Sequence, residues 1–251
     1  MNATIAGTVM QTVQIELAPG EQVYCQTHAM AWMTDDVRME TNTGGGLFAG
    51  LSRSLSGGSF FITTYTASGS SPSRIAFAPR FPGSILPFKL DAGQSLVCRK
   101  ETFLVAEKTV TLDIAFQQRL GAGVFGGEGF ILQRVTGPGT VWLDLSGEVV
   151  SQELAAGQRL LVQAGHVGII TPSVGFDIQR VRGARNLIFG GEGIFLASLA
   201  GPGKVWLQSM PILNLAEEVA RYMPQGQAVE NTTAGGVIGG LVGGLLGGGG
   251  H

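Results

Sequence analysis

Apolar and polar residues alternate along most of this chain in short stretches that are separated by glycine and proline. Residues 37–40, 110–113 and 174–177, for example, each begin with valine and end in a carboxylate. A period of two places alternate side chains on opposite faces of a β-strand, whereas a helix needs a period of about 3.6. The pattern therefore predicts an antiparallel, all-β fold for most of the chain.

Two long stretches of the chain resemble each other. Residues 125–143 read FGGEGFILQRVTGPGTVWL and residues 189–207 read FGGEGIFLASLAGPGKVWL, an offset of 64 (189 − 125). A shorter motif occurs three times, as LAPGEQVYC at 17–25, LDAGQSLVC at 90–98 and LAAGQRLLV at 154–162. Internal repeats indicate the architecture of a chain, because each repeat forms one structural unit.

The repeats divide one predicted β body, residues 1–211, into three units. These units comprise residues 15–88, 89–152 and 153–211. We align one Pro-Gly turn in each unit, and these turns begin at Pro82, Pro138 and Pro202. Three tandem units of short strands predict three small antiparallel β-sandwich lobes around a pseudo-threefold axis.

The pattern changes after the third unit. Residues 212–224 have the signals of one short helix, because Asn214 can cap its N-terminus and Pro224 can end it. Val219, Tyr222 and Met223 would then face the β body. Residues 225–251 comprise a polar linker and a glycine-rich, low-complexity tail.

The chain has few charged residues for its length. Of its 251 residues, 14% are charged and 44% are hydrophobic, and the formal net charge is −2. A surface so poor in charge favours a homo-oligomer, in which part of the surface is hidden. The lack of a basic excess disfavours nucleic-acid binding, because lysine and arginine are needed to neutralise phosphates.

The two cysteines have the pattern of core residues. Cys25 and Cys98 occupy equivalent positions of the repeat, and Val162 takes this position in the third unit. Valine at the same position indicates a small buried hydrophobic residue rather than a nucleophile or a metal ligand. Two cysteines form no disulfide framework, and residues 1–14 lack the features of a signal peptide, so we expect a cytoplasmic protein.

Two sets of carboxylates recur with the repeats. Glu128 and Glu192 lie in the FGGEG turns, where hydrogen bonding to turn amides is favoured over a role as an acid/base pair. The second set comprises the candidate metal ligands Glu40, Asp113 and Asp177 at the ends of equivalent strands. If these three converged, they could bind a hard cation. The favoured alternative is an acid at the solvent-facing end of each strand.

The sequence contains no recognisable catalytic pattern. His28 and His166 are not equivalent in the repeat, and the motifs HExxH, CxxC and GxSxG do not occur. We therefore predict no catalytic residues, no enzymatic activity and no cofactor.

The first unit carries an insertion at residues 41–56. Within it lies a candidate interaction loop, made of Gly44, Gly45, Gly46, Leu47 and Phe48. A phosphate-binding loop would need a following Lys-Ser/Thr and a βαβ unit, and the sequence has neither. We therefore favour an exposed loop whose apolar tip contacts another subunit or a partner.

Trp142 and Trp206 occupy matched positions in the two long repeats. Packing in the core is the favoured interpretation. The alternative is a small-ligand binding module in which these indoles line a site between the β lobes.

Glycines recur every four residues in the tail, at Gly235, Gly239, Gly243 and Gly247. In an apolar helix this spacing makes a smooth face for packing, although so many glycines destabilise an isolated helix in water. A disordered tail is favoured, and the alternatives are membrane contact and tail-to-tail packing within an oligomer.

Several segments in combination resemble the altered inheritance of mitochondria protein 24 family. They are residues 44–67, 74–88, 125–143 and 215–224, and the resemblance covers residue 3 to about residue 224. It implies three tandem copies of a short double-stranded β-helix-like sandwich, similar in fold to the tryptophan RNA-binding attenuator protein, and a homotrimer. It supplies no catalytic residues. Eukaryotic members are associated with the mitochondrial inner membrane, and because this chain has no transit peptide it looks like a bacterial member.

These observations predict a non-enzymatic structural or scaffold protein that forms a homo-oligomer, with a trimer favoured. RNA binding is not carried over from the attenuator protein, because the chain is slightly acidic. The tail and the glycine-rich loop are the segments expected to engage a protein partner or a membrane, which would place the protein in the cytoplasm, peripheral to the inner membrane.

Overall fold

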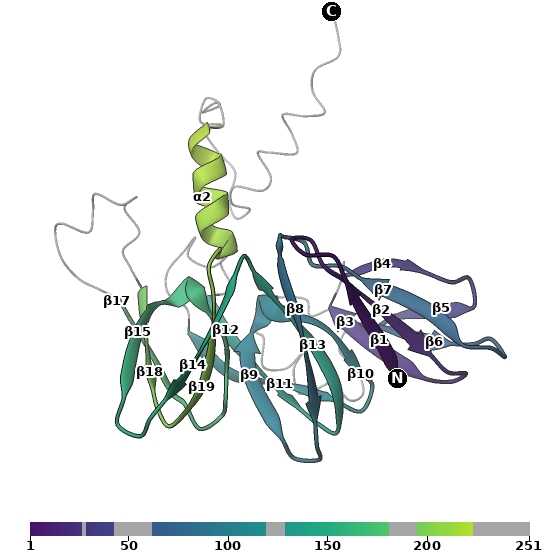
Figure 1. Cartoon of the computed structure of the whole chain (residues 1–251), viewed down its shortest axis with the longest axis horizontal. Helices are drawn as coiled ribbons and strands as arrows, with labels where there is room; N and C mark the ends of the chain where they lie inside the picture. Colours follow the sequence, from purple (N-terminus) through teal and green to yellow (C-terminus); the bar gives the residue numbers. More distant parts are fainter. Residues whose placement is uncertain (27–28, 43–61, 119–128, 181–194, 223–251) are drawn as a thin grey trace, which may run out of the picture.

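The computed structural model describes residues 1–26, 29–42, 62–118, 129–180 and 195–222. Within these residues the regular structure is almost entirely β-strand, which confirms the all-β class (Figure 1). The N-terminal strands are β1 (Asn2–Ala6), β2 (Thr12–Leu17), β3 (Gln22–Gln26), β4 (Met30–Met33), β5 (Val37–Asn42), β6 (Ile62–Ala67) and β7 (Ser73–Phe77).

Two further series of strands follow. The middle series is β8 (Gly83–Leu90), β9 (Ser95–Arg99), β10 (Phe103–Glu107), β11 (Thr111–Gln118), β12 (Phe130–Thr136) and β13 (Gly139–Ser146), with the 3₁₀ turn η2 (Lys100–Thr102) after β9. The last series is β14 (Val149–Leu154), β15 (Arg159–Gln163), β16 (Val167–Ile170), β17 (Gly175–Arg180), β18 (Phe195–Ala200) and β19 (Gly203–Gln208), with the 3₁₀ turn η4 (Ala164–His166) after β15.

These strands form four antiparallel sheets, which we name A to D. Sheet A has the order β1-β2-β7-β4, sheet B β5-β6-β3-β10-β13-β8, sheet C β11-β12-β9-β16-β19-β14, and sheet D β15-β18-β17. Adding six to each strand number of sheet B gives the order of sheet C. The topology therefore repeats with a period of six strands.

Each set of six strands, beginning at β2, β8 or β14, contributes to two sheets. Its first, third and sixth strands lie together in one sheet, and its second, fourth and fifth strands lie together in the next. Sheets B and C each combine two such groups, whereas sheet A holds one group plus β1 and sheet D holds one group alone. The predicted unit boundaries at residues 15, 89 and 153 fall inside these first strands. The pseudo-threefold arrangement of the sets in space stays a prediction.

One of the aligned Pro-Gly turns was assigned to the wrong position. The turns at Pro138 and Pro202 lead into β13 and β19, the sixth strands of their sets, whereas the turn at Pro82 leads into β8, a first strand. The same dipeptide serves both turns because proline and glycine favour any sharp change of chain direction.

The apolar residues form three clusters, one between each pair of successive sheets. Sheets B and C are consequently covered on both faces. This explains why residues 103–106 of β10 are all buried, since a strand with two covered faces needs apolar side chains on both of them. In the outer sheet D, Arg159, Leu161 and Gln163 of β15 are exposed, and Leu160 and Val162 between them are partly buried and buried.

One helix, α2 (Ile212–Tyr222), follows the last strand and projects from the β body (Figure 1). A helix is thus present within the predicted range 212–224, but it begins at Ile212, so the expected N-cap residue Asn214 lies inside its first turn. The orientation expected for Val219 and Tyr222 is wrong, because both side chains are exposed. Because the helix projects away from the sheets, these residues have no apolar surface of the β body beside them.

Candidate functional site

The site with the clearest structural signal is the pairing of one strand set with the next. In sheet B, β3 of the first set pairs with β10 of the second, and Cys25 lies opposite Val105 while Tyr24 lies opposite Ala106. All four residues are completely buried. The hydroxyl group of Tyr24 also donates a hydrogen bond to the carbonyl oxygen of Val110, 2.9 Å away, so β3 contributes directly to the core of the second set.

The next two sets meet in the same way. In sheet C, β9 pairs with β16, so that Cys98 lies opposite Ile169 and Val97 lies opposite Ile170. These residues are buried as well. The second strand of one set therefore pairs with the third strand of the following set at both internal junctions.

The same two kinds of strand are left unpaired at the ends of the chain. Strand β4 is the third strand of the first set, and β15 is the second strand of the last set; each has one sheet neighbour among the described strands. Figure 1 shows them at opposite ends of the molecule, so one copy of the chain does not bring them together. Each end therefore carries half of a junction.

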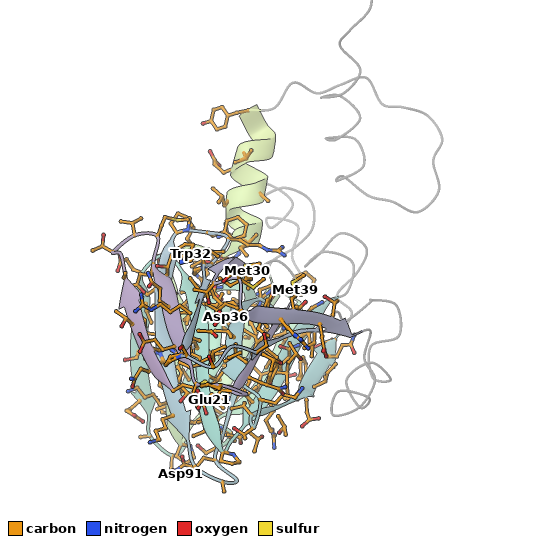
Figure 2. All side chains as sticks on the ribbon, turned by 90° about the vertical axis from the view of Figure 1, so that its right-hand side faces the viewer. Glu21, Met30, Trp32, Asp36, Met39 and Asp91 are labelled. Atoms are coloured by element: carbon orange, nitrogen blue, oxygen red, sulfur yellow. The ribbon has the colours of Figure 1, made fainter. Side chains whose placement is uncertain are left out.

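Both half-junctions expose large apolar side chains. Trp32 on β4 occupies the position of the buried Val105 and Ile169, but 50% of its surface is exposed. Figure 2 shows Trp32 on the end of the molecule formed by β4 and β5, near Met30. On β15, Leu161 occupies the position of Tyr24 and Val97, and it is 62% exposed. These exposed apolar side chains, at positions that are buried in the internal junctions, make the two edges candidates for an interaction surface.

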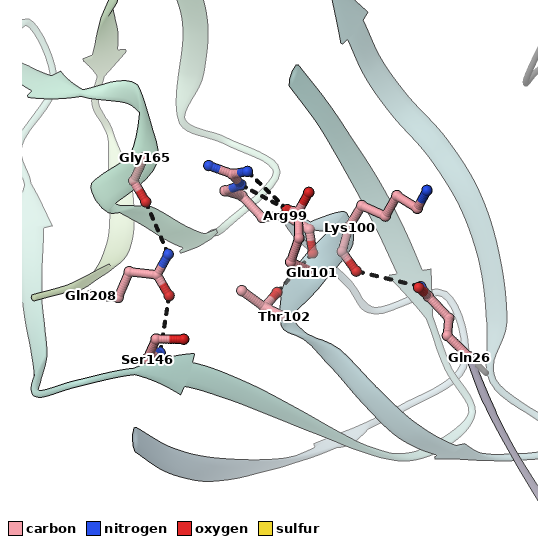
Figure 3. Close-up of polar contacts among 8 residues, drawn as sticks. All are labelled: Gln26, Arg99, Lys100, Glu101, Thr102, Ser146, Gly165 and Gln208. Carbon is pink, nitrogen blue, oxygen red and sulfur yellow. Dashed lines mark hydrogen bonds and ion pairs between the residues drawn. The ribbon is translucent and has the colours of Figure 1, made fainter. Parts of the chain in front are cut away.

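A polar cluster lies beside the internal junctions (Figure 3). The Arg99 guanidinium group binds the Glu101 carboxylate at 2.9 Å and lies 4.8 Å from the centre of the Phe130 ring. The amide of Gln26 donates hydrogen bonds to the Gln133 side chain at 3.2 Å and to the backbone oxygen of Lys100 at 3.4 Å. The cluster links the turn η2 to the strands on either side of it.

Asp144 and Gln208 stand at equivalent positions of β13 and β19 but have different environments. Gln208 accepts a hydrogen bond from the backbone amide of Ser146 at 3.0 Å and donates one to the oxygen of Gly165 at 2.9 Å (Figure 3). Burial raises the pKa of the Asp144 carboxyl group to about 7, and nearby Glu101 adds to the rise while Arg80 opposes it. Asp144 therefore holds a proton in the folded chain at pH values where an ordinary aspartate is ionised.

The raised pKa of Asp144 predicts a pH-dependent stability. The folded state binds the proton more tightly than the unfolded state, so this contribution is fully present below the unfolded pKa and is lost as the pH rises through about 7. Asp144→Asn should abolish this loss. From pH 5 to pH 8 the unchanged protein should lose roughly 2–3 kcal/mol of unfolding free energy through this group, and the variant should not. The stability of the variant minus that of the unchanged protein should therefore be larger at pH 8 than at pH 5 by this amount. Chemical denaturation at both pH values measures this change, and an equal difference at both would contradict it.

The structure does not bring the candidate metal ligands together. Glu40, Asp113 and Asp177 lie on β5, β11 and β17, which are edge strands of three different sheets, and all three side chains are exposed. In the described part of the chain, no group of three or more His, Cys, Asp or Glu side chains could hold a metal ion. Their positions match the solvent-facing alternative.

The remaining described candidates are packing residues. Cys25 and Cys98 are buried free thiols, and burial raises their pKa values to about 11 and about 12. Trp142 is buried, and Trp206 is partly buried with its ring centre 5.4 Å from that of Phe88. These observations favour the core interpretation of both tryptophans over ligand stacking.

Several predicted residues lie outside the described part of the chain. They are Glu128, Glu192, His28, Met223, the candidate loop Gly44–Phe48 and the tail glycines Gly235, Gly239, Gly243 and Gly247.

Sequence reasoning missed Trp32 and Leu161. The signal was available for Trp32, because the offset of 73 between Cys25 and Cys98 (98 − 25) also places Trp32 at the position of Val105. A tryptophan at that position is unremarkable until the structure shows that its strand has no neighbour on one side.

Comparison with known proteins places this architecture in a family. A family model described as mitochondrial biogenesis AIM24 matches residues 3–210. The chain belongs to this family. The match spans β1 to β19 and ends before α2, so the helix and tail of this AIM24-family chain lie outside it.

Two relatives of the AIM24-family chain come from one organism. An uncharacterized protein of Streptococcus pyogenes serotype M6 is 28% identical over 220 residues, which cover 84% of this chain and 86% of the relative. A crystal structure of a Streptococcus pyogenes protein matches with a TM-score of 0.72 and 26% identity, covering 88% of this chain and 99% of that one. The fold described above is therefore also seen in an experimental structure.

Within its described residues, the AIM24-family chain has no helix with the length and apolar character required to cross a bilayer.

Proposed function

We propose that this protein is a non-enzymatic structural subunit that assembles head to tail with copies of itself. The observation that carries the proposal is the pair of half-junctions, one on β4 and one on β15. Pairing β15 of one copy with β4 of the next would join sheets D and A into one continuous sheet. The strand order of this sheet would be like that of sheets B and C. The backbone groups along both edges would then find hydrogen-bond partners.

The internal junctions give the register of this contact. Cys25 and Cys98 lie opposite Val105 and Ile169, so Val162 of one copy would lie opposite Trp32 of the next. By the same rule Leu161 would lie opposite Met33. The register buries Trp32 and Leu161, the exposed large apolar side chains of these edges, in the contact between the copies.

A contact between two different surfaces forms a ring if its rotation closes and a filament if it does not. We propose a closed ring of three copies, in keeping with the trimer expected from the family resemblance. All copies in such a ring point α2 from the same face, because they are related by rotation about one axis. The ring would therefore present three C-terminal segments together, which suits a scaffold.

Cysteine cross-linking tests this assembly. Met33→Cys with Leu161→Cys places two thiols opposite each other across the proposed contact, at a separation suited to a disulfide. Oxidation should produce covalently linked chains, and sedimentation of the unchanged protein should give a mass of about 78 kDa (3 × 26.1 kDa).

The control is Met39→Cys with Leu161→Cys. Met39 is 54% exposed but lies on β5, outside the proposed contact. Equal cross-linking of the two variants, or the mass of a single chain at micromolar concentration, would contradict the proposal.

A further inference from the structure

We infer that Trp32 of one copy packs against the hydrophobic cluster between sheets C and D of the neighbouring copy. The core of the last strand set is then completed by a second copy of the chain. This inference rests on the proposed head-to-tail assembly and adds the side chains that determine its strength.

The three strand sets each carry one tryptophan in the same cross-strand pair, but on different strands. Val105 lies opposite Trp142 in the second set, and Ile169 lies opposite Trp206 in the third. In the first set, Trp32 on the third strand lies opposite Ala76 on the sixth. The tryptophan of the first set is therefore on the third strand instead of the sixth, and alanine is at the position on the sixth strand.

In the two complete junctions, this pair covers the core of the preceding set. Val105 and Trp142 belong to the cluster between sheets A and B. Ile169 belongs to the cluster between sheets B and C, and Trp206 packs against it. The corresponding pair, Trp32 and Ala76, lies in sheet A, and the described chain has no sheet beyond A that this pair could cover.

The cluster between sheets C and D lacks such a pair. Sheet D has three strands, whereas sheets B and C, which cover the other two clusters, each have six. Val150, on the edge strand β14 of sheet C, lies opposite Leu207 and is 58% exposed. Its equivalent in the first set, Val13, is completely buried.

A second copy supplies the missing half. When β4 extends sheet D, its neighbour β7 follows, and Trp32 and Ala76 take the place that Val105 and Trp142 have beside Val13. Trp32 then covers Val150. Leu161 packs into the cluster between sheets A and B of the incoming copy, as Tyr24 packs into the cluster between sheets B and C within one chain. The three exposed residues Trp32, Val150 and Leu161 are thus explained by one contact.

The test removes the indole and then returns it to the other strand. Trp32→Val should raise the dissociation constant of the assembly at least about 30-fold, because a tryptophan at the centre of an interface commonly contributes 2 kcal/mol or more. Adding Ala76→Trp recreates the Val-Trp pair of the second set and should restore most of the affinity. Met39→Val, at an exposed residue outside the contact, should leave it unchanged.

Sedimentation equilibrium over a dilution series measures each constant. Acrylamide quenching, compared between the unchanged protein and Trp32→Phe, should show that Trp32 is shielded in the assembly and accessible after dilution. If Trp32→Val assembles as tightly as the unchanged protein, or if Ala76→Trp restores nothing, the inference is overturned. The proposed assembly survives that result when Met33→Cys and Leu161→Cys still cross-link, and it fails as well when they do not.

Discussion

Leu161→Lys should dissociate the assembly, raising its dissociation constant about 100-fold or more. Leu161 occupies the position at which Tyr24 is completely buried and Val97 is 6% exposed. Burying a leucine side chain contributes about 1.5–3 kcal/mol, and a lysine at the same place must also be desolvated. Because each factor of ten in affinity corresponds to about 1.4 kcal/mol, both effects together reach two orders of magnitude.

The substitution leaves the folded single chain intact, since Leu161 is exposed there. Its thermal unfolding, measured below the concentration at which copies associate, should therefore match that of the unchanged protein. Met39→Lys is the matched control, because it places the same charge at a similarly exposed residue on β5. An unchanged sedimentation profile for Leu161→Lys would argue against β15 as the contact edge.

Gly83→Ala should have the largest effect on the stability of the chain itself. A Cβ atom at Gly83 would overlap the backbone oxygen of Leu145 and lie 2.9 Å from the Cα atom of Ser146. Both obstacles are backbone atoms of β13, which pairs with β8 along its whole length, so no side-chain rotation relieves the overlap. We expect a loss of about 3 kcal/mol or more in the free energy of unfolding.

Gly93→Ala separates this steric effect from the loss of a glycine. Gly93 has a φ of +82°, and a Cβ atom there would have no heavy atom within 4 Å. Alanine should therefore cost only about 1–2 kcal/mol, the strain of the left-handed conformation. Equal losses for Gly83→Ala and Gly93→Ala in urea unfolding would show that β8 and β13 separate easily at this point.

The proposed function depends on the difference between inner and outer junctions. A polar outer edge would indicate a chain that ends its own sheets, as proteins do when they avoid edge pairing. Here β4 has Trp32 and Met33, and β15 has Leu161 and Val162, at the positions that pair inside the chain. The outer edges therefore have the chemical character of inner ones.

The strands were largely predictable because their signals are local. Alternation of side chains marks β5, β11 and β17 near residues 37, 110 and 174, and the glycine turns at Gly20, Gly93 and Gly157 mark the entry to the following strand. At these three turns φ lies between +81° and +83°, which glycine adopts without strain. The alignment of the Pro-Gly turns was less accurate, because the dipeptide at Pro82 serves a different turn from those at Pro138 and Pro202.

The candidate site was not predictable in the same way. Glu40, Asp113 and Asp177 are equivalent in sequence, but the six-strand topology places them on edges of separate sheets. Trp32 lies outside the motifs from which strands were predicted, on β4. Its exposure results from the absence of a neighbouring strand, and no local pattern records that absence.

The sequence alone determined the all-β class, the family and the presence of repeated strands, since strand alternation, turn residues and recurring motifs are properties of neighbouring residues. Only the tertiary structure decided how each strand set divides between two sheets and which edges remain unpaired. Hydrogen bonding between strands joins residues as far apart as Cys25 and Val105. Such pairings depend on the packing of the whole chain. The half-junctions at Trp32 and Leu161 can therefore be identified only from the strand order of all four sheets.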